Sequence, residues 1–213
     1  MLVNFTENHQ FTTRLQLKGE NIEIVDKMKI LGTIITDKLT WDDNCDYLIK
    51  KVNARMQLLR GVLSFGASDE EMVHLWITFC RSVLEQSCVV WHGSLTQENV
   101  DDLERTQKTF CKLVLRQKYK DYEHSLLYLN LDFLKKRREV LCLQFAKAGI
   151  KHDKLNDLLP EQVKHDNMKT RNKEKYKVNF AHTGRLKKSS IISMQNILND
   201  DAAIEASRKR SCG

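Results

Sequence analysis

The stretch from Leu15 to Trp41, which reads LQLKGENIEIVDKMKILGTIITDKLTW, decides the fold of this chain of 213 residues. Two short runs of alternating apolar and polar residues lie in it, on either side of Lys18-Gly19-Glu20-Asn21. Alternation with a period of two around such a turn predicts a β-hairpin. A third apolar run, Ile30-Leu31-Gly32-Thr33-Ile34-Ile35, predicts one further strand with Leu31 and Gly32 inside it. Such a small antiparallel sheet needs a helix to cover its apolar face.

Amphipathic helices are predicted after this sheet. In the first, apolar residues recur at spacings of three and four, and the pattern predicts a start capped by Thr40 or Asp42 and an end at Gly61. Ser68 and Glu71 have the spacing of a capping box and predict the start of the next helix.

The remainder of the chain predicts more helices and then a basic tail. Polar residues that suit helix starts occur at Ser94 or Thr96, at Asp121 and at Asp132. The lysine-rich segment 164–177 predicts a linker, and Ser190 to Leu198 predicts a short final helix. We therefore expect an α+β, mainly α fold, in which a small N-terminal antiparallel sheet precedes a bundle of about five helices and a basic tail. The expected segments are 1–40, 41–160 and 161–213.

The composition indicates a folded, basic protein. Hydrophobic residues make up 41% of the chain and charged residues 30%, and the formal net charge is +7, which makes a polyanionic partner plausible. The sequence lacks a run of eighteen apolar residues, so we expect no membrane span. The six cysteines form no C-x-x-C pair, which is typical of buried thiols in a reducing compartment, either cytoplasm or nucleus.

Motifs of known catalytic chemistry are absent from the sequence. It contains no G-x-S-x-G, H-E-x-x-H or P-loop motif, and most of its acidic pairs fall where helices are predicted to begin, which suits the positive end of the helix dipole. A zinc site from Cys80, Cys88 and His92 lacks a ligand pair with the usual spacing. We therefore expect no catalytic residue, metal or cofactor, and a structural role for His92.

Basic residues mark one part of the first predicted helix. Lys50, Lys51, Arg55 and Arg60 lie outside its apolar stripe. Such a row can follow a phosphate backbone, where each cation displaces a condensed counterion. An ordinary solvated helix face explains the same pattern, and the sequence leaves both interpretations open.

The order of these motifs resembles the end of the palm and the start of the thumb in the reverse transcriptases of non-LTR (LINE-like) retrotransposons. The matching segments are Lys29-Ile30-Leu31-Gly32, Leu39-Thr40-Trp41, Cys88-Val89-Val90-Trp91, Leu103-Glu104-Arg105-Thr106-Gln107-Lys108 and Thr183-Gly184-Arg185-Leu186-Lys187-Lys188-Ser189. The family usually has an aromatic residue where this chain has Ile30. Each motif is short, so the resemblance depends on their order along most of the chain.

The resemblance implies a nucleic-acid-binding role for three residues of the predicted sheet and four of the first helix. These are Lys29, Leu31, Gly32, Lys50, Lys51, Arg55 and Arg60. The hairpin and the strand with Leu31 and Gly32 would form the primer grip, and the helices after Trp41 would form the thumb. Gly32 either lets the backbone approach the primer closely or marks a strand bulge.

The resemblance further implies a catalytically incomplete fragment. Its metal-binding aspartates, the rest of its palm and its fingers would lie upstream of Met1, so we expect the chain alone not to be an enzyme. Its expected partners are an RNA–DNA or DNA duplex, held through the backbone, and the missing upstream palm and fingers. The alternative is a stand-alone basic helical adaptor that binds an acidic protein partner.

Overall fold

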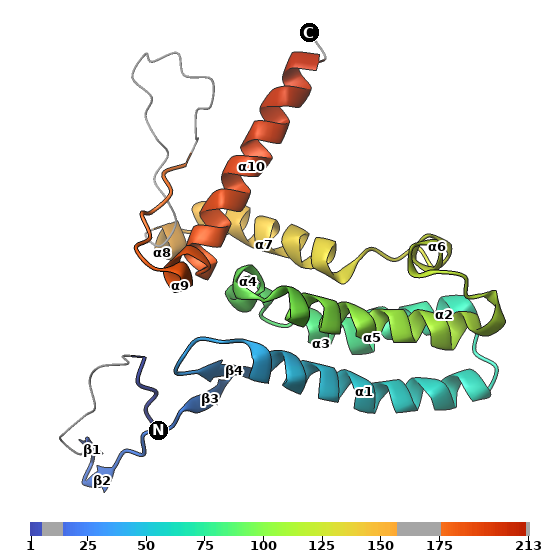
Figure 1. Cartoon of the computed structure of the whole chain (residues 1–213), viewed down its shortest axis with the longest axis horizontal. Helices are drawn as coiled ribbons and strands as arrows, with labels where there is room; N and C mark the ends of the chain where they lie inside the picture. The colour runs from blue at the N-terminus through green and yellow to red at the C-terminus, as the bar shows by residue number, and fades with distance from the viewer. Residues whose placement is uncertain (6–14, 157–175, 212–213) are drawn as a thin grey trace. The chain divides into compact units, whose positions relative to one another are not determined.

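The computed structural model of this protein describes residues 1–5, 15–156 and 176–211 (Figure 1). The chain forms two compact units, and its mainly helical α+β class confirms the prediction. The first unit comprises Met1–Ser87 and Leu95–Leu134, and the second comprises Cys88–Ser94 and Lys135–Gly213. The expected boundary at residue 160 lies outside the described residues, and the functional division at residue 40 stays a prediction.

The first predicted hairpin is present but short. Strand β1 (Gln16–Leu17) pairs antiparallel with β2 (Glu20–Asn21). The turn between them is made by Lys18 and Gly19, whose φ angles of +52° and +86° suit a tight hairpin turn. Leu2, before the hairpin, and Ile24, after it, form an isolated parallel bridge.

The predicted third strand is in fact two strands. β3 (Lys27–Ile30) pairs antiparallel with β4 (Thr33–Thr36), and Ile30 lies opposite Thr33. The expectation of one small sheet was therefore wrong, because the described strands form two separate two-stranded sheets. The chain reverses at Leu31 and Gly32, so these two residues lie in a turn and not inside a strand.

Helix α1 (Asp42–Ser64) follows the second hairpin and contacts β4. Its buried apolar residues recur every three or four positions and are Cys45, Leu48, Val52, Met56, Leu59 and Leu63. The helix begins after Trp41 without a side-chain capping bond, and it continues through Gly61 to Ser64, with Phe65 as its C-cap residue. Both predicted limits were wrong. Gly66, with a φ of +90°, follows the helix end and has the left-handed conformation typical of that position.

Three consecutive helical segments follow. They are α2 (Asp69–Leu75), the π-helix η1 (Trp76–Arg81) and α3 (Ser82–Glu85). The predicted capping box is confirmed, because Ser68 accepts from the amide of Glu71 while the Glu71 carboxylate accepts from the amide of Ser68.

The first unit is completed by helix α5 (Gln97–Leu115), which packs on α1 and α2. The 3₁₀ turn η3 (Arg116–Lys118) and helix α6 (Tyr122–Tyr128) both contact α5. Thr96 and Asp121 cap α5 and α6 as predicted, since their side chains accept from backbone amides in the first turn. In the core, the rings of Trp76 and Phe110 stack with centroids 4.6 Å apart.

The second unit has its own core. Its segments are α4 (Cys88–Trp91), the 3₁₀ turn η2 (His92–Ser94), most of α7 (Leu134–Ile150), α8 (Asp153–Asn156), α9 (Gly184–Lys187) and α10 (Ser190–Ser211). Ala146, Tyr176, Met194 and Leu198 are buried together. Helix α7 begins two residues after Asp132, and α10 continues well beyond the predicted end at Leu198. Most of the predicted linker lies outside the described residues.

Candidate nucleic-acid interface

The tip of the β3–β4 hairpin projects an apolar side chain into solvent. Leu31 has a φ of +48° and is 90% exposed, and Gly32 has a φ of +86°. Positive φ at both turn residues matches the right-handed twist of the paired strands, which explains a two-residue connection. Gly32 is therefore required by the turn, so neither of the interpretations left open by the sequence, a strand bulge or a close backbone approach, is needed to explain it.

The hairpin tip is fixed to the end of α3. The side-chain amide of Gln86 donates a 3.0 Å hydrogen bond to the carbonyl oxygen of Leu31. A Cβ atom at Gly32 would lie 2.5 Å from the Gln86 Nε2 atom, so a larger residue would force the Gln86 side chain to move. Gln86 could not be predicted from the sequence, because 55 residues separate it from Leu31 and no local pattern links the two.

Two lysines converge on Tyr47 beside this hairpin. The Lys29 ammonium on β3 donates a 2.6 Å hydrogen bond to the Tyr47 hydroxyl and lies 4.2 Å from the ring centroid. The Lys51 ammonium, one turn further along α1, lies 5.3 Å from the same centroid. The structure thus brings together Lys29 and Lys51, two of the predicted residues, through an aromatic ring between them. Cation–π attraction favours this arrangement.

The surroundings of Tyr47 are electropositive. The hydrogen bond from Lys29 is the largest cause that lowers the pKa of the Tyr47 hydroxyl from its usual value, and the charge of Lys51 acts in the same direction. Next to this cluster, Lys27 forms a 3.3 Å ion pair with Asp43. Tyr47 and Lys27 were not among the residues predicted from the sequence. Lys27 shares a strand face with Lys29 and Tyr47 precedes Lys51 by four residues, so the spacing alone contained both signals.

Arg55 has a structural partner. Its guanidinium donates to the carbonyl oxygen of Phe79, and its Cζ atom lies 4.4 Å from the centroid of the Phe79 ring. Phe79 belongs to the π-helix η1, where the backbone bonding pattern is displaced from that of an α-helix. Arg55 therefore joins α1 to η1, which does not fit the predicted role of a free phosphate ligand.

The four predicted cations of α1 do not form one row. Residues of an α-helix are about 100° apart around its axis, so Lys51 and Arg55 lie within about 40° of each other. Arg60 is nine positions from Lys51 and lies about 180° away from it. Lys50 and Arg60 are both exposed, but they face other directions. Only Lys51 joins the cluster at the hairpin.

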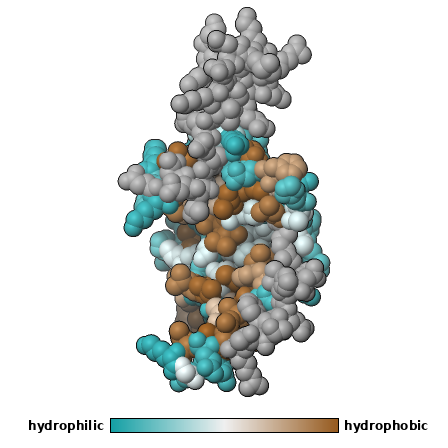
Figure 2. Space-filling model, turned by 90° about the vertical axis from the view of Figure 1, so that its left-hand side faces the viewer, coloured by the Kyte–Doolittle hydropathy of each residue, from teal (hydrophilic) through white to brown (hydrophobic). Residues whose placement is uncertain are grey.

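The end of the first unit that carries the hairpins exposes both apolar and polar residues. Figure 2 faces this end, and hydrophobic and hydrophilic residues lie next to each other in the lower part of the view. Leu17 is 66% exposed, and Leu31 is almost fully exposed. We define the hairpin surface as Lys29, Leu31, Gly32, Tyr47 and Lys51.

The second unit holds a different basic residue in its interior. Arg138 is fully buried, its Nε atom donates a 3.3 Å hydrogen bond to Nδ1 of His92, and its guanidinium lies 5.8 Å from the Trp91 ring. Burial, followed by the charges of Arg138 and Lys135, lowers the pKa of His92 to about 4. A neutral imidazole accepts this bond, which agrees with the structural role expected for His92.

Among the residues whose placement is described, His, Cys, Asp and Glu do not gather in any group of three that could hold a metal ion. Within residues 1–5, 15–156 and 176–211, no helix combines the length and the apolar content that crossing a bilayer requires.

No protein-family profile, curated protein or solved structure matches this chain.

Proposed function

We propose that the hairpin surface holds a template–primer duplex, RNA–DNA or DNA, through its sugar–phosphate backbone, the role of the primer-grip and thumb region in a retroelement reverse transcriptase. The convergence of Lys29 and Lys51 on Tyr47 carries this proposal. Two ammonium groups held close together repel each other, and the negative charge of a backbone phosphate beside them would offset that repulsion. The upstream palm and fingers would supply the rest of the duplex-binding cleft.

The arrangement favours contacts with phosphates over contacts with bases. The Tyr47 ring already has an ammonium 4.2 Å from its centroid and another at 5.3 Å, so it offers little free face for stacking a base. Backbone contacts position a duplex and carry no sequence information. The proposed binding is therefore independent of sequence and strongly dependent on salt.

In this proposal the chain contributes binding and no catalytic group. The joining reaction would require carboxylates from the palm, which hold the metal ions of a polymerase. We also propose a reducing intracellular location, either cytoplasm or nucleus. The five cysteines in the described part of the chain are free thiols and buried, which fits such a compartment.

Fluorescence anisotropy with a labelled RNA–DNA duplex tests the proposal. The double variant Lys29→Gln, Lys51→Gln should weaken binding and reduce the slope of log K against log salt by about 1 for each phosphate contact removed. The matched control is Lys108→Gln, Lys112→Gln, which removes two exposed lysines of α5. The control should bind the duplex as the unaltered chain does.

Two results would contradict the proposal. One is binding that does not change with salt, and the other is an equal loss in the control variant. A third result would favour the adaptor alternative. In that case polyglutamate would bind as tightly as the duplex, and the same double variant would abolish its binding.

A further inference from the structure

An apolar stripe runs along the C-terminal half of α1, whereas the hairpin surface carries two lysines. Leu58, Val62 and Phe65 are 61%, 38% and 93% exposed. Their spacing of four and then three residues places them on one face of the helix. The stripe flanks the buried face of α1 and is separate from the residues proposed to bind the duplex. Large apolar side chains exposed next to one another on a protein surface are typical of interaction sites.

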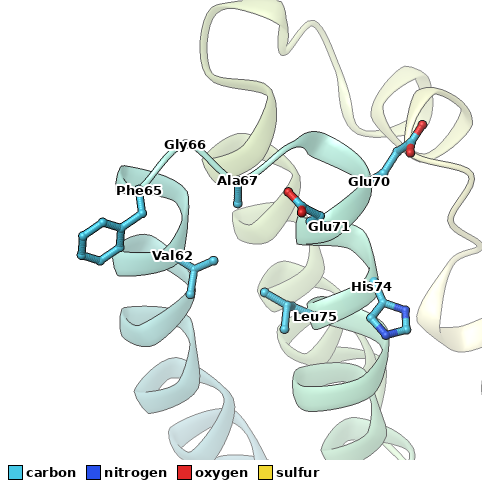
Figure 3. Close-up of a pocket in the computed structure, with 8 residues that line it drawn as sticks. All are labelled: Val62, Phe65, Gly66, Ala67, Glu70, Glu71, His74 and Leu75. Atoms are coloured by element: carbon cyan, nitrogen blue, oxygen red, sulfur yellow. The ribbon is translucent and has the colours of Figure 1, made fainter.

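Two residues of this stripe, Val62 and Phe65, line a groove. A hollow of about 740 Å³ lies between the end of α1 and α2, and Figure 3 shows Val62 and Leu75 pointing toward each other across it. Gly66 and Ala67 make the connection between the two helices at the closed end. A groove between two helices suits a third helix, whose ridges of side chains fit between theirs.

A second hollow adjoins the other side of α2. It measures about 620 Å³, and Tyr128 and Leu129 at the end of α6 contribute to its lining. The neighbouring Leu127 is 83% exposed. Glu70 lines both hollows, so the two belong to one surface. We call it the α2 surface, made by the residues that line the two hollows together with the exposed Leu58 and Leu127.

The charge of the α2 surface is opposite to that of the whole chain. Among the described residues that line its hollows, the fully charged ones are Asp69, Glu70 and Glu71, although the chain has a net charge of +7. The Glu71 carboxylate accepts a hydrogen bond in the capping box, and Oδ2 of Asp69 lies 3.6 Å from Nζ of Lys118. Glu70 is exposed and lines both hollows, so its charge lies at the edge of each. A nucleic acid would be repelled here.

We propose that the α2 surface docks a basic amphipathic helix of a partner protein. Its apolar side chains, at a spacing of three and four residues, would fill the groove beside Val62 and Phe65, and its Lys or Arg residues would face Glu70. The stripe from Leu58 to Phe65 spans about 10 Å along α1, so about two turns of the partner would be in contact. Charge complementarity selects such a partner over an acidic helix with the same apolar face.

Two synthetic peptides test this inference on the full chain. Both form amphipathic helices with the same leucine face, but one has lysines and the other glutamates on its remaining positions. In anisotropy titrations the lysine peptide should bind at least about tenfold tighter than the glutamate peptide. The variant Phe65→Ser should weaken binding about tenfold, and Glu70→Lys should remove the preference for the lysine peptide. Phe65 is exposed, so Phe65→Ser should leave the thermal unfolding curve unchanged. Glu70→Lys should lower the midpoint only slightly, because it places a cation in the first turn of α2.

Leu31→Ser is the matched control, because Leu31 is as exposed as Phe65 but lies on the hairpin surface. It should bind the lysine peptide as the unaltered chain does. Equal loss in Leu31→Ser, a preference that survives Glu70→Lys, or no peptide binding would each overturn the inference. Sedimentation velocity gives a separate check, because a dimer that Phe65→Ser abolishes would mean that a second copy occupies the groove, and the inference would be wrong.

Discussion

The indole Nε1 of Trp76 donates a 3.1 Å hydrogen bond to the side-chain oxygen of Gln107, and both residues are completely buried. The amide nitrogen of Gln107 in turn donates to the Tyr122 hydroxyl at 3.0 Å and to the backbone carbonyl of Asp132 at 2.9 Å. Gln107 belongs to the Leu-Glu-x-x-Gln-Lys segment of α5. In this structure the glutamine of that segment joins η1, α6 and the start of α7 inside the first unit.

Replacement of Gln107 by Leu should destabilise the first unit. The indole N–H of Trp76 would lose its acceptor in a site without water access, and an unpaired buried polar group costs about 1–3 kcal/mol. Urea denaturation followed by tryptophan fluorescence should show a loss of about that size. Gln57→Leu, at an exposed position of α1, is the control and should stay within about 0.5 kcal/mol. Equal stability of the two variants would mean that the network contributes little.

Two glycines should respond to alanine in opposite ways. Gly32→Ala should lower stability by about 1–2 kcal/mol, because its φ of +86° disfavours a side chain and the new Cβ would displace Gln86. Gly61→Ala should raise stability by about 0.5–1 kcal/mol, because Gly61 lies inside α1 and an added Cβ meets no atom within 4 Å. Midpoints of urea unfolding measure both changes. A gain for Gly32→Ala would contradict the turn geometry.

Arg55→Lys should separate stability from nucleic-acid binding. Lysine keeps the charge but loses the planar guanidinium that contacts the carbonyl and the ring of Phe79, so we expect a loss of about 1–2 kcal/mol. The salt dependence of duplex binding should not change. Arg60→Lys, at an exposed position, should affect neither quantity. If Arg55→Lys alone changed the salt dependence of duplex binding, Arg55 would have to be a phosphate ligand after all.

His92 should make the stability of the second unit depend on pH. Burial lowers its folded-state pKa to about 4, below the usual value of 6.5. The unfolded state therefore binds more protons between these two values, so this contribution to stability is present above pH 6.5 and is lost as pH falls toward 4. His92→Gln should flatten the decline in unfolding free energy across that window. His124→Gln, at an exposed position of α6, should leave the decline as it is.

Helix starts and the overall class could be predicted because their causes are local. A side chain at Ser68, Thr96 or Asp121 reaches an amide two or three residues away, so short patterns in the sequence suffice. The limits of α1 could not be read in this way. Gly61 is tolerated inside the helix because packing on the core outweighs its low helix propensity, and Gly66 supplies the left-handed residue after the end.

The β3–β4 turn could not be predicted from the usual turn signal. Leucine rarely adopts a positive φ, so Leu31-Gly32 within an apolar run indicates a continuous strand. The bond from Gln86, distant in the sequence, supports the turn in the folded chain. For the candidate site, charge and spacing singled out Lys51, whereas Lys29 followed only from the resemblance, and the structure brings the two beside Tyr47. The sequence could not predict that Arg55 donates to a carbonyl oxygen of the π-helix, because the spacing of apolar residues does not identify such a helix.

The interruption of the first unit by Cys88–Ser94 has a practical consequence for dissecting this protein. A truncated gene that stops at codon 134 would encode all of the first unit, but it would also carry the short insert without the rest of its own unit. Trp91, which has no exposed surface in the intact chain, would then lose the guanidinium of Arg138 beside it. Separate expression of the first unit therefore requires replacing Cys88–Ser94 with a hydrophilic loop, whereas the second unit requires that segment to be joined to residues 135–213.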